Sequence, residues 1–145
     1  MSELAAHNPS ERAEALIRLT ARLAELLDTE TALFEARKPH EAVALQAEKT
    51  RLATIYRTET RLAGQDPARL GGLTEPVKAR LRESTARFES ALARNGAAVE
   101  ALKSLTEGLV KALADEAARQ AQAKAGYGPN AAKAGIGAIA CNQTA

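Results

Sequence analysis

The 145-residue chain has no tryptophan and only two tyrosines, two phenylalanines and one cysteine. Because aromatic residues are scarce, the apolar 46% of the chain comes mostly from alanine and leucine. That composition suits narrow helical seams better than a thick globular core. The lone Cys141 leaves no thiol for a disulfide framework or for a metal site built from several thiolates.

The chain also has no strong excess of positive or of negative charge. Charged residues make up 26% of the chain and the net charge is +2, whereas a dedicated nucleic-acid binder usually carries a clustered basic face. No apolar run approaches membrane-spanning length, and residues 1–9 have neither a cationic start nor an apolar segment of the secretory type. We therefore expect a soluble cytoplasmic protein that neither binds nucleic acid nor inserts into a membrane.

Signals for catalysis are poor. The two histidines, His7 and His40, lie in a terminal segment and at a predicted helix break, with no cysteine or carboxylate cluster at ligand spacing. The glycines around Gly126–Gly128 follow no strand and include no Gly-Lys-Ser/Thr, so they do not resemble a phosphate-binding loop. The helical carboxylates fall at spacings that we interpret as solvent-facing: Glu25, Asp28, Glu30, Glu35, Glu48 and Glu59. The sequence thus predicts no enzyme, no cofactor and no metal.

A first helix is predicted over about 9–37. Asn8 is suited to the N-cap, Pro9 to the first helical position and Glu11 to the acidic position of a capping box, although a Ser10 cap fits about as well. A stripe with 3-4 spacing follows and is interrupted at Glu30: Leu16, Leu19, Leu23, Leu26 and Leu33. Such a stripe is typical of a helix that buries one face.

A second helix is predicted over about 40–63. Pro39 disfavours helix at Lys38 and is able to open a new helix itself. The short break favours an antiparallel hairpin of the first two helices. The second helix should end near Gly64, where the loop that contains Pro67 and Gly71–Gly72 begins.

A third and much longer helix is predicted over about 75–124, with Thr74 as its cap. Two seams alternate along it at heptad spacing, one with Leu81, Phe88, Asn95, Leu102 and Leu109, the other with Thr85, Leu92, Val99, Thr106 and Leu113. An amide at Asn95 would fix the register of a coiled coil if it were buried with a partner. The alternative is that Gly96 marks a kink and that Asn95 is solvated there.

The predicted fold is all-α, with an antiparallel helical hairpin packed on the long third helix in a coiled-coil-like bundle. We expect one helical domain over 1–125. Residues 126–145 are rich in glycine and alanine and bury little, so they are expected to form a disordered tail.

The predicted helix lengths do not match. At 1.5 Å per residue the three helices span roughly 40, 35 and 75 Å, so the hairpin covers only about half of the third helix. The uncovered half still carries a set of apolar residues, namely Leu102, Leu105, Leu109, Val110 and Leu113. Because such a stripe is too apolar to be left bare, it indicates a helical partner or a second copy of the chain.

Three segments together resemble the FlgN family of flagellar export chaperones. "LTARLAELLDTETALFEARKPHEAVALQAEKTRLATIYRTETRL" (Leu19–Leu62) is similar to the first two helices of that family, with Leu45, Lys49 and Leu52 in matching places. "RNGAAVEALKSLTEGLVKAL" (Arg94–Leu113) resembles its long terminal helix. "GYGPN" (Gly126–Asn130) resembles the Tyr-Gly-Pro-Asp-Gly signature that follows, although Asn130 replaces the aspartate and an unfamiliar extension runs to Ala145.

The resemblance implies a cytoplasmic chaperone that binds helical termini of hook-associated proteins, prevents their premature assembly and delivers them to the export gate of the flagellar type III secretion machine. It places client binding at Asn95–Leu113, which adds Asn95, Val99 and Thr106 to the apolar stripe. It also implies that Tyr127 docks on the export gate, unless the tyrosine packs back on the bundle. The alternative function is a homo-oligomeric coiled-coil structural or adaptor protein, such as a homodimer, whose self-association consumes the same stripe.

Overall fold

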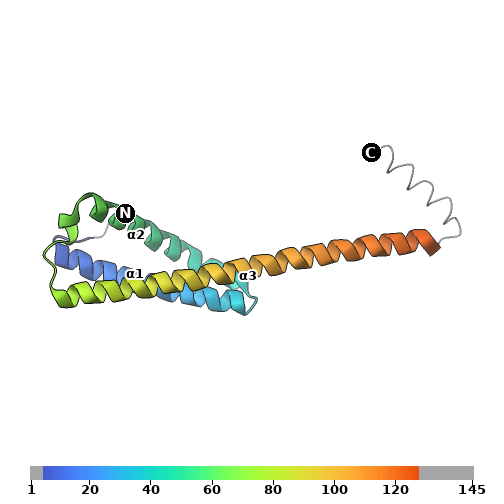
Figure 1. The fold of residues 1–145 in the computed structure, drawn as a ribbon, viewed down its shortest axis with the longest axis horizontal. Helices are drawn as coiled ribbons and strands as arrows, with labels where there is room; N and C mark the ends of the chain where they lie inside the picture. The colour runs from blue at the N-terminus through green and yellow to red at the C-terminus, as the bar shows by residue number, and fades with distance from the viewer. Residues whose placement is uncertain (1–4, 128–145) are drawn as a thin grey trace. The chain divides into compact units, whose positions relative to one another are not determined.

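The computed structural model describes residues 5–127 (Figure 1). In chain order it contains the helix α1 (Pro9–Glu35), the 3-10 helix η1 (Pro39–Leu45), the helix α2 (Gln46–Gln65), the 3-10 helix η2 (Pro67–Leu70) and the helix α3 (Glu75–Tyr127). The described residues include no strand, which confirms the all-α prediction. The chain divides into two compact units, residues 1–102 and residues 103–145. The predicted disordered tail, residues 126–145, lies almost wholly outside the described residues.

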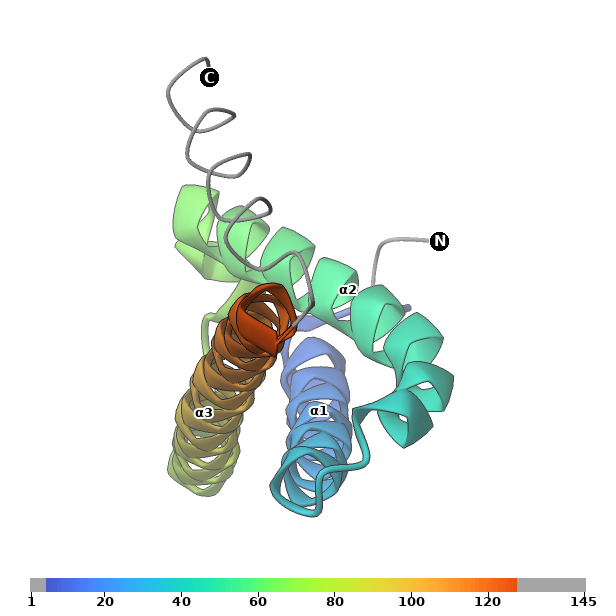
Figure 2. The same cartoon turned by 90° about the vertical axis from the view of Figure 1, so that its right-hand side faces the viewer.

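The first unit is a three-helix bundle (Figure 2). Contacts between α1 and α2 pair Arg12 with Glu59 and Arg22 with Glu48, so the sequence numbers rise on one helix as they fall on the other. This order confirms the antiparallel hairpin. The core cluster is drawn from all three helices: Leu16, Leu19, Leu23, Ala24, Leu26, Leu27, Leu52, Ile55, Phe88 and Ala91.

The α1 helix begins as one of the two predicted caps requires. Asn8 has an extended backbone, and its side chain accepts a hydrogen bond from the Glu11 backbone N–H at 2.8 Å. In return, Glu11 Oε2 accepts the backbone N–H of His7 at 2.9 Å. Because both bonds satisfy backbone groups that a helix start leaves free, Asn8 rather than Ser10 is the cap.

The α1 helix ends in a Schellman motif at the hairpin turn. The Lys38 N–H donates to the Leu33 carbonyl at 2.8 Å, and the Arg37 N–H donates to the Phe34 carbonyl at 3.1 Å. Arg37 therefore takes the left-handed conformation, with φ of 62°, at a position where glycine is usual. The segment predicted as one helix over 40–63 is then divided, because residues 39–45 wind as the tighter η1, which buries Ala42 and leaves Val43 70% exposed.

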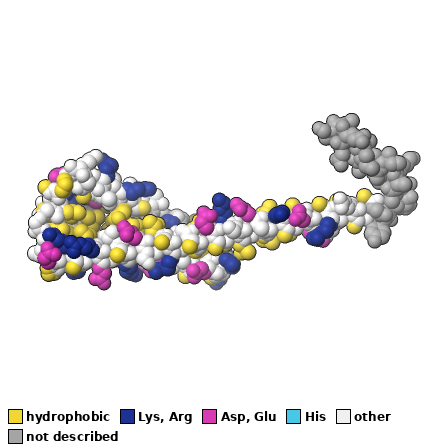
Figure 3. All heavy atoms as spheres, viewed as in Figure 1, with side chains coloured by type: hydrophobic (Ala, Val, Ile, Leu, Met, Phe, Trp, Pro, Cys, Tyr) yellow, Lys and Arg dark blue, Asp and Glu magenta, His cyan; other side chains and the backbone are white. Residues whose placement is uncertain are grey.

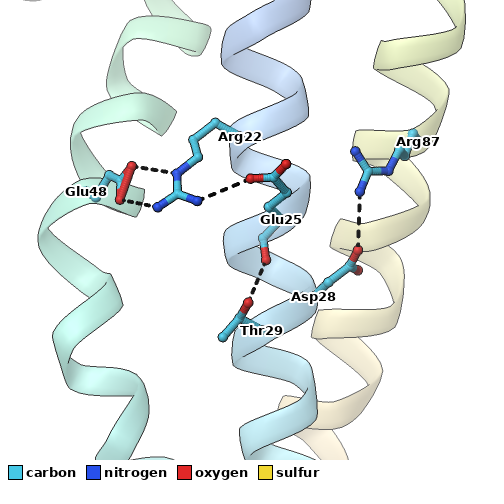
Figure 4. A network of polar contacts seen from close by, with 6 residues as sticks. All are labelled: Arg22, Glu25, Asp28, Thr29, Glu48 and Arg87. Atoms are coloured by element: carbon cyan, nitrogen blue, oxygen red, sulfur yellow. Dashed lines mark hydrogen bonds and ion pairs between the residues drawn. The ribbon is translucent and has the colours of Figure 1, made fainter.

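The α1 and α3 helices run parallel and in register. Four side-chain contacts join them at nearly constant separations along the chain: Glu14–Arg80 at 66, Thr20–Ser84 at 64, Asp28–Arg94 at 66 and Glu30–Asn95 at 65 residues. A constant offset is what two parallel helices of equal rise produce. Figure 4 shows one exposed contact of this pairing, in which Asp28 faces Arg87 of α3. It also shows Arg22 of α1, which bridges Glu25 of the same helix and Glu48 of α2.

Two carboxylates interpreted as solvent-facing are buried, which corrects that prediction. Glu30 is 2% exposed and Glu59 is 1% exposed. Each is compensated by cations: Lys49 Nζ lies 2.6 Å from Glu30 Oε2, and Arg69 Nη2 and Arg12 Nε lie 3.2 and 3.5 Å from Glu59 Oε2. Burial of a charge is tolerated only with such partners. The hydrophobic periodicity of a sequence does not show which charged residues will have them.

Candidate functional site

The apolar residues in the second half of α3 are exposed. Leu105 is 49%, Leu109 59%, Val110 62% and Leu113 62% exposed, and every described side chain over 103–125 is exposed. Figure 3 shows hydrophobic atoms interspersed with charged ones along this part of the helix. We call Leu105, Leu109, Val110 and Leu113 the α3 stripe. Hydrophobic residues at i, i+4 and i+8 share one helical face, so the stripe is a continuous apolar strip about three turns long.

The same seam is covered within the first unit. There, Phe88 is 8%, Ala91 0% and Asn95 7% exposed, because α1 and α2 supply neighbours. The heptad pattern does not change between these positions and Leu109, so the pattern predicts a packing partner for the seam in both halves of α3. Only the first half finds one within the described chain.

The remaining predicted client-binding residues have different environments. Asn95 is buried and donates from Nδ2 to Glu30 Oε1 at 2.9 Å and to Thr31 Oγ1 at 3.3 Å. Of its two alternatives, the buried, register-fixing amide is therefore observed, and Asn95 is not part of an exposed surface. Val99 is 40% exposed, Leu102 is half-buried and Thr106 is exposed.

Charges of both signs surround the α3 stripe. Lys103, Glu107, Lys111 and Asp115 are all exposed and alternate in sign along the helix. Arg119 Nη2 lies 2.5 Å from Glu116 Oε2 one turn away on the helix surface. Exposed pairs of this type contribute little stability, about 0.3–0.5 kcal/mol. Their role is to keep an exposed helix soluble and to bias which partner charges are accepted.

The Glu30 carboxylate connects the three helices beside Val99. Gln46 Nε2 and Lys49 Nζ donate to Oε2 at 2.5 and 2.6 Å, and Asn95 donates to Oε1. Burial raises the pKa of the Glu30 carboxyl, but hydrogen bonds from Lys49, Gln46 and Asn95 more than offset this, so the pKa lies below its ordinary value. Glu30 is therefore a charged carboxylate that holds α3 in register on the hairpin.

A partial signal for this cluster is present in the sequence. Glu30 interrupts the leucine stripe of α1 at an inward position, and Asn95 occupies an inward position of α3. Two polar residues that interrupt apolar seams on different helices are candidates for a hydrogen bond with each other. What the pattern lacks is the pairing itself, which depends on the register of α1 against α3.

The described residues contain no group of three or more His, Cys, Asp or Glu side chains able to hold a metal ion. Within residues 5–127, no helix combines the length and the hydropathy that crossing a bilayer requires. Tyr127 is the last residue of α3, and its side chain lies outside the described residues, so its predicted contact with the export gate stays a prediction.

Comparison with known proteins gives one clear relationship. No family model matches the chain, and no solved structure is similar to it. The flagellar basal-body protein FlbY of Caulobacter vibrioides is 37% identical to the chain over 122 residues, which cover 84% of this chain and 82% of FlbY. At that identity and coverage, the chain belongs to the family of the flagellar basal-body protein FlbY.

Proposed function

We propose that this protein is a chaperone of flagellar biogenesis that binds helical termini of hook-associated proteins and delivers them to the flagellar type III export gate. The single observation that carries the proposal is the α3 stripe, which is strongly apolar and exposed on a helix whose first half packs the same seam. The name of FlbY supports the flagellar setting. The resemblance to FlgN-type chaperones supports the export role.

The geometry fits a partner that is itself a helix. The leucines of the α3 stripe, at i, i+4 and i+8, present knobs for one facing helix, with Val110 beside them. The alternating charges around the stripe select the orientation of the partner. The stripe covers only about three turns, and a client segment must become ordered in order to bind. Both features limit affinity, which suits a chaperone that releases its client.

The test is calorimetric titration of the chain with the terminal helical segment of a hook-associated protein from the same organism. The double variant Leu105→Asp/Leu109→Asp should weaken binding at least about 100-fold, because two central apolar anchors each contribute about 1.4 kcal/mol or more. Both residues are exposed, so the circular dichroism spectrum should not change.

The matched control is Ser104→Asp/Gln122→Asp, which adds the same charge to exposed positions that are not four or eight residues from any residue of the α3 stripe. It should bind the client normally. Normal binding by the leucine variant would remove the proposed site, and absence of binding by the unaltered chain would remove the proposed function.

Self-association is the second candidate, because the same exposed stripe is able to pair with another copy of itself. Light scattering separates the two. A tight dimer whose mass does not change with concentration, and which the leucine variant dissociates, would favour the coiled-coil adaptor. A monomer that binds the client would favour the chaperone.

The proposed gate contact has a separate test. Tyr127→Ala should leave folding and client binding unchanged and should weaken binding to the cytoplasmic domain of the export gate. A fall in melting temperature on this substitution would mean instead that the tyrosine packs on the helices.

A further inference from the structure

The first unit has a hollow between α2 and α3 that neither its core nor the α3 stripe accounts for. A cavity of about 150 Å³ opens there. Its floor is Leu16 and Thr20 of α1, and Leu70 of η2 closes one end. The walls come from α2 and α3: Tyr56, Glu59, Thr60 and Ala63 on one side, Leu81 and Thr85 on the other. Figure 3 shows the hydrophobic atoms that gather in this hollow.

The hollow exists because of one aromatic contact. Tyr56 and Phe88 meet edge to face with ring centroids 5.0 Å apart, and these large side chains hold α2 and α3 apart. One turn toward η2, the facing residues are Thr60, Ala63 and Thr85, which are too small to fill the space that results. A cavity of about 150 Å³ is large enough for one apolar side chain of the size of a benzene ring.

Basic residues neighbour the lining residues of the hollow along both helices. On α2, Arg57 follows Tyr56 directly, and on α3 Lys78 and Arg82 stand beside Leu81 and Thr85. Within the described residues, Arg57 and Arg82 are exposed and make no ion pair, whereas Lys78 is paired with Glu75 at 3.3 Å. Glu89, one turn beyond Thr85, is exposed and acidic.

The one charged residue that lines the cavity, Glu59, is more than neutralised by the cations behind it. Glu59 is shared by two arginines, Arg12 and Arg69, so that triad carries a net charge of +1. The Nε atoms of both arginines are buried and find no hydrogen-bond acceptor among the described residues. A cleft with low-dielectric walls and an excess of one sign attracts the opposite charge.

We propose that this groove between α2 and α3 is a second docking surface, which takes an amphipathic helix of a partner protein with acidic flanks. One leucine-sized side chain enters the cavity between Leu16, Tyr56 and Leu81, and carboxylates on either side of it meet Arg57 and Arg82. The groove and the α3 stripe lie on different parts of the chain, so one molecule is able to hold two partners.

The test uses two designed 18-residue helical peptides with identical leucine stripes, one flanked by glutamates and the other by lysines. Fluorescence anisotropy with the full chain should give at least about tenfold tighter binding for the glutamate peptide, with affinity that falls as salt rises. Equal affinities, or no binding by either peptide, would overturn the proposal.

Variants then locate the contact. Arg57→Glu/Arg82→Glu should weaken the glutamate peptide about tenfold or more, whereas Arg18→Glu/Arg51→Glu, which makes the same charge change at exposed sites away from the groove, should have less than a twofold effect. Thr85→Phe fills the cavity and should also weaken binding, with Thr54→Phe as its exposed control. An unaltered affinity in either groove variant would overturn the proposal.

Two further outcomes distinguish this surface from the others. The variant Leu105→Asp/Leu109→Asp should bind the peptide normally, and a loss of binding would mean that the peptide occupies the α3 stripe instead. A dimer of the unaltered chain that Thr85→Phe dissociates would mean that a second copy fills the groove, which also overturns the proposal.

Discussion

At the scale of single residues, the most consequential side chain is Glu30. It lies where α1, α2 and α3 meet, and its two oxygens accept from Gln46, Lys49 and Asn95. A buried carboxylate with all its partners present tolerates no shift of α3 by one residue, because the Asn95 amide would lose its acceptor. Glu30 thus contributes specificity of register as well as stability.

Glu30→Ala should lower the free energy of unfolding by about 2–3 kcal/mol, because it leaves the Lys49 ammonium and the buried Asn95 amide without their acceptor. Urea denaturation measures this. Glu25→Ala, which removes a carboxylate that is 56% exposed, should change the free energy by less than about 0.5 kcal/mol. Equal losses for the two variants would contradict the role given to Glu30.

The same carboxylate predicts an acid response. The folded-state pKa of Glu30 lies below the ordinary value of 4.5, so folding is linked to its ionised form. This contribution should be complete above about pH 5 and should be lost as the pH falls through the folded pKa. Glu30→Gln should be less stable at pH 7 and should lose less stability on acidification to pH 3 than the unaltered chain does. Parallel losses in the two proteins would contradict the assignment.

At the scale of elements, α3 carries two glycines in its interior. A Cβ added at Gly96 or at Gly108 would meet no atom within 4 Å, so neither glycine is required for close packing. Gly96→Ala should therefore stabilise the chain by about 0.5–1 kcal/mol, because alanine loses less backbone freedom when a helix forms. A lower midpoint of urea denaturation for this variant would show that Gly96 is packed or bent in solution.

The elements were predictable to different degrees. The spacing of Leu16, Leu19 and Leu23 was sufficient for α1, and Asn8 and Arg37 account for its ends. The tight winding of η1 was not predictable, because it depends on the path of the backbone after Arg37. That path places Ala42 in the core. The groove beside Tyr56 was also missed, since its width is set by which side chains of α2 and α3 face each other.

At the scale of the whole molecule, the chain combines a self-sufficient bundle with a helix that presents apolar side chains to solvent. The mismatch in helix length made the α3 stripe predictable, because periodicity and length are both properties of sequence. Asn95 was included in the predicted binding surface because the sequence alone does not show that its partner Glu30 lies within the bundle. We therefore propose that Leu105, Leu109 and Leu113 bind the partner, whereas Asn95 fixes the register of the bundle.

Hydrogen exchange of α3, measured with and without the terminal helical segment of a hook-associated protein, tests directly whether the α3 stripe binds a client. In the free chain, amides over 103–113 should exchange much faster than those of the bundle over 80–95, because every side chain over 103–113 is exposed. Addition of the client should slow exchange over 103–113 at least about tenfold. Protection confined to residues outside 99–113, or unchanged exchange at saturating client, would contradict the account.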